Sequence, residues 1–383
     1  MTGLRKLLVR AIAILFGLAL AILFAEVALR LLSWPGPPLR SGRLETQHRS
    51  PPSRPDFRDR PNPLASEKAD GVYRIVVVGD SFTWGAGVLS QDAYPDVLAE
   101  ELERRARRSG AGDEGEAADT GAASDDEDPD AETVLGARNT TQAGVPAGAV
   151  VEVVNFSRPG WNTVQEHGAL QRTIDRLSPD LLVLGYCLND AEPHRRRELV
   201  RLRRGLYPRE PETAVERFLH ARSALFRLAF RRADNVRMRR ATAAYYHRFY
   251  VDGQPTWVEA QRALTDMRAL AASRAIPFVV VVFPIFDSQL DHRYRYHALH
   301  ETMRVTGAEL EIDVVDLLPR YAGIDARRLA LDPFLDAHPS ELGHRIAAIA
   351  ILEELEARGH LPGGPGDRAE ASSAPTPEGP ESK

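Results

Sequence analysis

The chain has 383 residues, 43% of them hydrophobic and 27% charged, which is ordinary for a globular core and allows one large or two modest domains. Its only cysteine, Cys187, excludes an intrachain disulfide. The net charge of −5 is small, but acidic residues are concentrated in one segment and arginines in another.

Residues 1–33 predict a membrane anchor. An uncharged run from Ala11 to Ala25 follows three basic residues. A bilayer needs roughly 20 apolar residues, and a helix from Leu7 to Leu29 reaches that length if Arg10 and Glu26 lie near the two interfaces. Because the basic flank precedes the apolar run, we expect the rest of the chain outside the cytoplasm, in a periplasmic or extracellular location.

A cleaved signal peptide is the alternative interpretation. Its cleavage site would have an Ala-x-Ala pattern, whereas Ala25-Glu26-Val27-Ala28 has two residues between the alanines. We therefore favour an uncleaved signal anchor. Residues 34–70, rich in Pro, Arg and Ser, predict a linker to the first strand.

The domain predicted over residues 71–360 begins with a buried strand. An apolar, largely β-branched run from Ile75 to Val78 ends abruptly in Gly79-Asp80-Ser81. Such runs are typical of buried parallel strands, and ligands in open α/β sheets bind beyond the carboxyl ends of the strands. Ser81 therefore occupies a position suited to a nucleophile, although the segment lacks the Gly-x-Ser-x-Gly spacing of a nucleophile elbow.

A helix predicted at 92–107 leads into an acidic segment. Residues 108–148 are mainly Gly, Ala, Asp, Glu and Thr, with almost no large apolar side chain. A segment of this composition buries too little apolar surface to fold, so we expect it to be disordered.

Two further strands end in residues that can donate hydrogen bonds. The strand at 150–156 leads to Gly160, and after a helix at 164–177 the strand at 181–186 leads to Asn189. Backbone N–H groups and amide side chains in such positions can stabilise an oxyanion.

An arginine-rich helical insertion is predicted at 192–250. Its larger apolar side chains recur at helical spacing opposite arginines, at Val215, Phe218, Leu219, Phe226, Ala229 and Phe230. We interpret this pattern as an amphipathic helix that packs on the core with a solvated basic face. The alternative is a lid or a membrane-facing surface that attracts anionic lipid or polysaccharide.

The rest of the domain alternates helix and strand. A helix at 257–274 precedes a strand at 278–283, a further strand lies at 313–316, and residues 361–383 predict a disordered tail. Five parallel strands with intervening helices indicate an α/β protein, arranged as a three-layer α/β/α sandwich.

A carboxylate and a histidine lie together near the C-terminus. Asp336 precedes His338 by two residues, and Pro339 predicts the first turn of a final helix. A serine early in the chain, with aspartate and histidine late, supplies a nucleophile, a general base and a group that orients the base.

These segments, in this order, resemble the four blocks of the SGNH (GDSL-type) hydrolase superfamily. Gly79-Asp80-Ser81 matches the first block and Gly160 the second. Cys187-Leu188-Asn189-Asp190 matches the third, with cysteine in place of the family's glycine. The fourth block is Asp-x-x-His in the family, and Asp336 with His338 is a variant that is one residue shorter.

Because the fourth block is one residue shorter than in the family, the sequence does not decide which carboxylate orients His338. Asp336 is the preferred candidate, and Asp332, six residues before His338, is the other. The resemblance implies that Ser81 is the nucleophile and His338 the general base. It also implies a flavodoxin-like, five-stranded parallel sheet.

The resemblance further implies an oxyanion site. The Ser81 backbone N–H, the Gly160 backbone N–H and the Asn189 side-chain amide would be its donors. Asp80 and Asp190 would hold the surrounding loops rather than transfer protons.

The implied activity is hydrolysis of carboxylic esters of acetyl or short acyl groups through a covalent acyl-Ser81 intermediate. The alternatives are an O-acyltransferase acting on cell-envelope polysaccharide and a catalytically silent domain that binds a glycan or a partner. The expected partners are an ester-bearing small molecule, a lipid or an acylated polysaccharide, and the membrane through the N-terminal helix. Nucleic acid is not expected outside the cytoplasm.

No cofactor or metal is expected. A cluster of acidic and imidazole side chains lies at Asp291, His292, His297 and His300, and its spacing is not that of a zinc site.

Overall fold

The computed structural model describes residues 2–32, 64, 67–110, 150–193, 195–332 and 336–362. Most of the predicted linker, the acidic segment from residue 111 and the tail from residue 363 lie outside the described residues. The chain divides into two compact units. One contains helix α1 (Thr2–Leu32) and residues 200–245, and the other contains the sheet and its helices.

A five-stranded parallel sheet forms the centre of the second unit. In spatial order its strands are β2 (Val150–Ser157), β1 (Val72–Gly79), β3 (Leu181–Tyr186), β4 (Phe278–Val282) and β5 (Asp313–Asp316). Every residue of β3 and β4 is buried, as expected of continuous apolar strands covered on both faces. The strand order 2-1-3-4-5 confirms the predicted flavodoxin-like fold.

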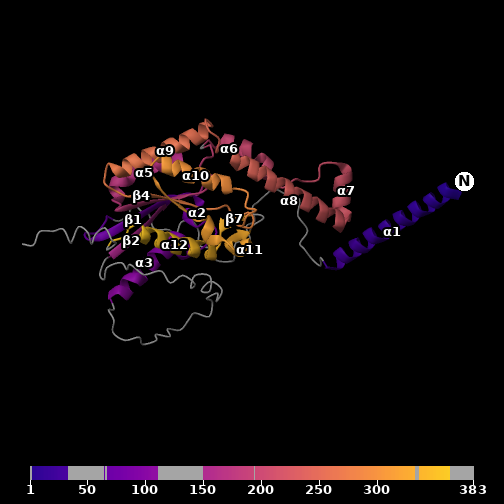
Figure 1. Ribbon diagram of the computed structural model, residues 1–383, viewed down its shortest axis with the longest axis horizontal. Coiled ribbons are helices and arrows are strands. Elements are labelled where there is room, and N and C mark those ends of the chain that lie inside the picture. Colours follow the sequence, from indigo (N-terminus) through magenta and orange to yellow (C-terminus); the bar gives the residue numbers. More distant parts are fainter. Residues whose placement is uncertain are drawn as a thin grey trace, which may run out of the picture. The chain divides into compact units, whose positions relative to one another are not determined.

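Helices cover both faces of this sheet (Figure 1). On one face lie α3 (Tyr94–Gly110) and α12 (Glu341–Ala357), which are joined by an Arg105–Glu356 ion pair of 2.5 Å. The other face carries α5 (Thr163–Leu177), α9 (Pro255–Ala272) and α10 (His297–Glu309). Shorter turns are α2 (Ser81–Trp84), η1 (Ser90–Asp92), η3 (Leu318–Tyr321) and α11 (Ala326–Leu329).

A small antiparallel ribbon, which the sequence did not predict, precedes α12. It pairs β6 (Ala330–Asp332) with β7 (Asp336–Pro339). The prediction that Pro339 begins the final helix is wrong, because Pro339 ends β7 and pairs with Ala330. Ser340 is the N-cap instead, and its hydroxyl oxygen accepts a hydrogen bond from the Gly343 N–H at 3.2 Å.

The arginine-rich insertion is helical but is not one amphipathic helix. It contains α6 (Arg196–Arg203), η2 (Arg204–Leu206), α7 (Ala214–Arg222) and α8 (Ala224–His247). Ser223 separates α7 from α8, because its backbone is extended and its hydroxyl accepts the Phe226 N–H at 3.0 Å. A capping serine therefore divides the apolar pattern that suggested a continuous helix.

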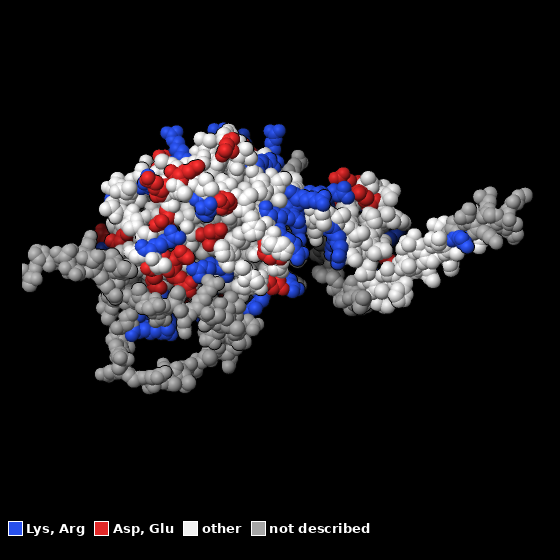
Figure 2. Space-filling model, in the orientation of Figure 1, with Lys and Arg blue, Asp and Glu red and all other residues white. Residues whose placement is uncertain are grey.

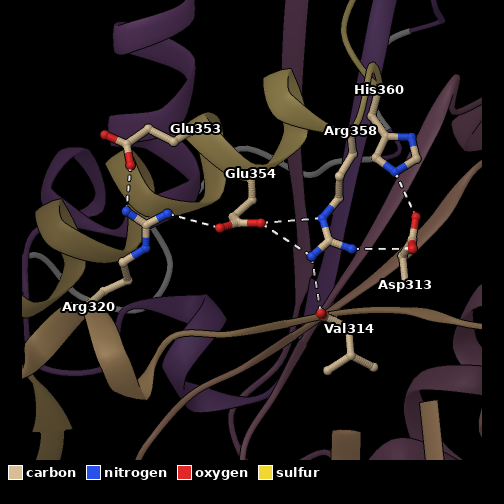
Figure 3. Close-up of polar contacts among 7 residues, drawn as sticks. All are labelled: Asp313, Val314, Arg320, Glu353, Glu354, Arg358 and His360. Carbon is tan, nitrogen blue, oxygen red and sulfur yellow. Dashed lines mark hydrogen bonds and ion pairs between the residues drawn. The ribbon is translucent and has the colours of Figure 1, made fainter. Parts of the chain in front are cut away.

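A chain of ion pairs fastens the end of α12 to neighbouring elements (Figure 3). Arg320 contacts Glu353 at 2.6 Å and Glu354 at 2.9 Å. Arg358 contacts Glu354 and also Asp313 of β5, each at 3.3 Å. These side chains are partly exposed, so the network positions α12 more than it stabilises the fold.

A substitution at Gly185 tests how tightly β3 packs beneath α2. A Cβ at Gly185 would overlap Thr83 Oγ1 and Tyr94 Oη, which hydrogen-bond each other at 2.9 Å. We expect Gly185→Ala to lower the free energy of unfolding by about 1–3 kcal/mol in chemical denaturation, because the core must shift to admit a methyl group.

Gly168→Ala is the matched control for this substitution. Gly168 lies inside α5, where the nearest atom to a new Cβ is Arg172 Nη1 at 3.5 Å. We expect this variant to gain about 0.5–1 kcal/mol from reduced backbone entropy of the unfolded chain. Equal stability of Gly185→Ala and the wild type would contradict the packing described for β3.

Candidate active site

The register of three strands brings three loops to one edge of the sheet. Gly79, at the end of β1, is paired with Ser157 of β2 on one side and with Gly185 of β3 on the other. The chain therefore leaves β1, β2 and β3 at nearly the same level of the sheet. The loops after β2 and β3 lie on either side of the loop after β1. The strand order reverses beside β1, which is where open α/β sheets bind ligands.

Asp80 shapes the turn that presents Ser81. Its Oδ1 accepts the Phe82 N–H at 2.8 Å and so caps the short helix α2. Gly85 ends that helix in the left-handed region, with φ of 74°, which favours glycine. Ser81 is therefore placed immediately beyond β1, partly exposed.

Ser81, His338 and Asp336 form a hydrogen-bonded chain. Ser81 Oγ lies 2.9 Å from His338 Nε2, and His338 Nδ1 lies 2.5 Å from Asp336 Oδ1. A carboxylate only accepts, so Nδ1 carries the proton and Nε2 accepts from the hydroxyl. Asp80 Oδ2 also lies 3.3 Å from Ser81 Oγ, but the shorter contact directs the hydroxyl proton towards the imidazole.

The β6–β7 ribbon explains why Asp336, and not Asp332, contacts the imidazole. Asp332 and Asp336 face each other across the ribbon, and Asp336 is on the same strand as His338. The two side chains of an i, i+2 pair on one strand point to the same face. The Asp336 carboxylate also accepts the His338 backbone N–H at 3.3 Å, which holds the two residues together.

The loop after β3 positions Asn189 against the serine turn. Asn189 Nδ2 donates to Asp80 Oδ2 at 2.9 Å. Asp190 Oδ2 accepts the Cys187 N–H at 2.7 Å, which closes the loop beneath Asn189. Asn189 Oδ1 is buried and has no hydrogen-bond partner among the described residues.

Gly160 lies on the loop that follows β2. Its φ of 80° is in the left-handed region, and a Cβ there would meet no atom within 4 Å. The loop is tied to β1 by the Arg158 N–H, which donates to Gly79 O at 3.0 Å. Among the described residues, no hydrogen bond links Gly160 to Ser81 or to Asn189.

Three buried carboxyl groups surround the base of the site. Burial raises the pKa of Asp80 above its ordinary value, and hydrogen bonds from Asn189 and Phe82 oppose that rise. Burial, and then the proximity of Asp80, raise the pKa of Glu166 well above its ordinary value. Burial, and then the charges of Glu166 and Asp80, likewise raise the pKa of Asp190.

Sequence reasoning missed Glu166. Both its oxygens are buried without a hydrogen-bond partner among the described residues. Glu166 lies on the buried face of α5, in register with Leu170, Ile174 and Leu177. The signal in the sequence that could have found it is a single carboxylate among apolar residues at helical spacing.

Two other side chains that could react, those of Cys187 and His300, are buried in the protein. Cys187 is buried, and burial together with nearby carboxylates raises the pKa of its thiol, which disfavours a nucleophilic thiolate. His300 is buried and its Nδ1 contacts Asp316 at 2.7 Å, whereas His297 is exposed. Over the described ranges, no group of three His, Cys, Asp or Glu side chains is placed to hold a metal ion.

Comparison with known proteins identifies the family. Residues 123–346 match the model of the GDSL-like lipase/acylhydrolase family, which is more than half of the chain. The chain therefore belongs to this family, and membership supports ester hydrolysis in general. The match includes Gly160, Asn189, Asp336 and His338 but begins after Ser81, so the contacts of Ser81 described above are what link it to the site.

Among solved structures, TesA matches with 12% identity and a TM-score of 0.40, covering 74% of this chain and 98% of that chain. Axe2, an acetylxylan esterase from Geobacillus stearothermophilus, matches with 15% identity and a TM-score of 0.39, covering 74% and 94%. LAE5, an alpha/beta hydrolase enzyme from the metagenome of Lake Arreo, Spain, matches with 16% identity and a TM-score of 0.40, covering 76% and 96%. These similarities are too low to carry an argument about substrate. No curated protein matches the chain.

Glu166→Gln should change how stability depends on pH. A carboxyl group with a raised pKa in the folded state contributes its full stability below the ordinary glutamate pKa and loses it as pH rises through the raised value. Glutamine resembles the protonated form, so we expect the variant to lose less stability between mildly acidic and mildly alkaline pH. The gain over wild type at the alkaline end should be about 1–3 kcal/mol.

Urea unfolding across this pH range measures the effect. The exposed Glu309→Gln provides a control that removes the same charge from the surface. A slope in Glu166→Gln equal to that of the wild type would show that Glu166 does not take up a proton on folding.

Proposed function

We propose that the protein is a serine esterase that cleaves acetyl or short acyl esters through an acyl-Ser81 intermediate. The observation that carries this proposal is the chain of contacts from Asp336 through His338 to Ser81. It lies at the carboxyl edge of the sheet, beside the reversal of strand order. Membership of the GDSL-like family supports the same reaction class.

In the first half of the reaction, Ser81 Oγ attacks the ester carbonyl carbon while His338 Nε2 removes the hydroxyl proton. Asp336 holds the proton on Nδ1 and stabilises the imidazolium that forms. The tetrahedral intermediate then expels the alcohol, which takes the proton from Nε2. In the second half, water attacks the acyl-serine, His338 accepts a proton from that water, and the acid leaves as Ser81 regains its own.

The developing oxyanion would be met by the Ser81 N–H, the Gly160 N–H and the Asn189 amide. The hydrogen bond from Asn189 to Asp80 supports this role, because it fixes the amide's orientation before substrate binds. One such donor is typically worth roughly 3 kcal/mol of transition-state stabilisation. Asp80 and Asp190 act by holding the two loops.

Buried aromatic rings beside the base support a short acyl group. The Phe82 ring centroid lies 5.2 Å from that of His338, and Phe286 stacks on Phe82 at 6.3 Å. Both phenylalanine rings are buried, so one side of the imidazole is occupied by the protein's own side chains.

We also propose that α1 is an uncleaved anchor that places the esterase unit outside the cytoplasm. The segment Leu8–Leu31 has a mean hydropathy of 2.6 and is long enough to cross a bilayer, and its described side chains from Leu8 to Phe24 are exposed. Arg5 and Lys6 precede the segment and Arg10 lies in its first turn, whereas Arg30 near its other end is paired with Glu26.

Ser81→Ala should remove esterase activity. We expect turnover of p-nitrophenyl acetate to fall at least about 1,000-fold, because no other group replaces the nucleophile. Asp336→Asn should lower it about 100- to 10,000-fold by favouring the wrong imidazole tautomer. Ser273→Ala, which changes an exposed serine at the end of α9, should leave turnover unchanged.

Two other outcomes would favour a different function. A stoichiometric burst without turnover would indicate an O-acyltransferase whose polysaccharide acceptor is missing. Absence of both turnover and fluorophosphonate labelling of Ser81 would favour a silent binding domain.

Reporter fusions test the location. A C-terminal alkaline phosphatase fusion, which is active only outside the cytoplasm, should be active in bacteria, and the purified chain should retain its N-terminus. An inactive fusion would reverse the topology, and a shortened N-terminus would establish the signal peptide instead.

A further inference from the structure

Within the first unit, a carboxylate of α1 caps α8. Glu26 accepts the Ala224 N–H at 2.8 Å, the Leu225 N–H at 2.9 Å and the Ser223 hydroxyl at 2.9 Å. It also pairs with Arg30 one turn further along α1, at 2.7 Å. These bonds satisfy N–H groups that a helix start otherwise leaves open, so α1 and the α7–α8 junction are fastened together.

The side chains of α1 change from exposed to partly covered at the point where its contact with the α7–α8 junction begins. All its described side chains between Leu8 and Phe24 are exposed, whereas Ala25, Glu26, Ala28 and Leu29 are partly covered. The exposed stretch spans about 25 Å of helix axis, close to the roughly 30 Å of bilayer hydrocarbon. The α7–α8 junction therefore meets α1 where the apolar stretch ends.

The helix α7, which leads into that junction, exposes apolar side chains along one face. Val215 is 67% exposed and Phe218 is 54% exposed. Arg222 shares their face and places its guanidinium 4.4 Å from the centre of the Phe218 ring. An aromatic ring beside arginine, open to solvent, is typical of a helix that lies in the interface of a membrane.

The charge of this unit has the opposite sign to that of the whole chain. Residues 200–245 contain twelve arginines, no lysine and four acidic residues, whereas the chain has a net charge of −5. Figure 2 shows basic side chains gathered over α8. Among the arginines of α8, Arg231, Arg232 and Arg240 are exposed and form no ion pair with any described residue. Such a surface attracts an anionic partner.

We propose that α7 and the arginines of α8 bind the surface of the bilayer that α1 crosses, with Val215 and Phe218 in the headgroup region and the arginines on anionic phospholipid. This inference rests on the proposed anchoring by α1. Continuity with α1 selects a lipid surface over a soluble polyanion, because the Glu26 contacts hold the junction at the end of the apolar stretch. The unit would thus have two membrane contacts, a spanning helix and an interfacial one.

Site-directed nitroxide labelling of the full chain in nanodiscs tests the proposal. Cys187 is buried, so single cysteines introduced by Val215→Cys and Phe218→Cys can be labelled selectively. Leu15→Cys on α1 reports bilayer insertion, and Val258→Cys on α9, 48% exposed, is the water-exposed reference. The measurement compares accessibility to oxygen with accessibility to a water-soluble nickel chelate, in phosphatidylcholine and in phosphatidylcholine–phosphatidylglycerol discs.

We expect labels at 215 and 218 to favour oxygen over the chelate in the anionic discs, whereas the label at 258 favours the chelate. Reversing two charges with Arg231→Glu and Arg232→Glu should lower the ratio of docked to undocked α7 roughly five-fold or more in anionic discs. The same charge change at Arg293 and Arg295, which are exposed in the other unit, should have little effect.

Three results would overturn the inference. Labels at 215 and 218 that resemble the label at 258, while Leu15 is in the bilayer, would show that α7 stays in water. Equal protection in neutral and anionic discs would remove the assignment to anionic phospholipid. Protection that appears in detergent as protein concentration rises would assign the surface to a second copy of the chain. A water-exposed label at Leu15 would instead overturn the anchor itself, which distinguishes the two failures.

Discussion

The alignment of Gly79 with Ser157 and Gly185 across three parallel strands is the constraint on which the site depends. It makes the chain leave β1, β2 and β3 at one edge, so that residues up to 109 positions apart in sequence, such as Asp80 and Asn189, become neighbours. Glycine at 185 is required because Thr83 and Tyr94 occupy the space where a side chain would lie. The close packing beneath α2 therefore helps to hold Ser81 in place.

The same edge concentrates buried carboxyl groups. Asp80 caps α2 and accepts a hydrogen bond from Asn189, and burial raises its pKa. Burial, and then the proximity of Asp80, raise the pKa of Glu166, and burial, and then the proximity of Glu166 and Asp80, raise the pKa of Asp190. Burial of carboxylates without a nearby cation is costly, which indicates that protons are retained there at pH values where exposed carboxyl groups have lost them. The loops of the site are thus coupled to pH through carboxyl groups outside the Asp336–His338 pair.

The arginine-rich insertion belongs with α1 rather than with the sheet. Its capping by Glu26 gives a physical reason for an acidic residue near the end of an otherwise apolar helix. A charge in that position is unfavourable in hydrocarbon but is satisfied by three donors at a helix start. The proposed anchoring and the proposed surface binding would then be properties of one compact unit.

The sequence alone determined the strands of the sheet, because continuous apolar runs ending in polar turns are local signals, and their order predicted the α/β/α fold. It also identified Ser81, Asn189, Asp336 and His338 as candidates, through their places in polar turns and through the resemblance to the blocks of the family. It left the choice between Asp336 and Asp332 open, because that choice depends on the pairing of β6 with β7. It missed the division of the insertion at Ser223 and the buried Glu166, since both depend on which groups surround a side chain after folding. The contact of Glu26 with α8 joins residues nearly 200 positions apart, and only the tertiary structure could decide it, because no local pattern encodes the partner of a helix cap.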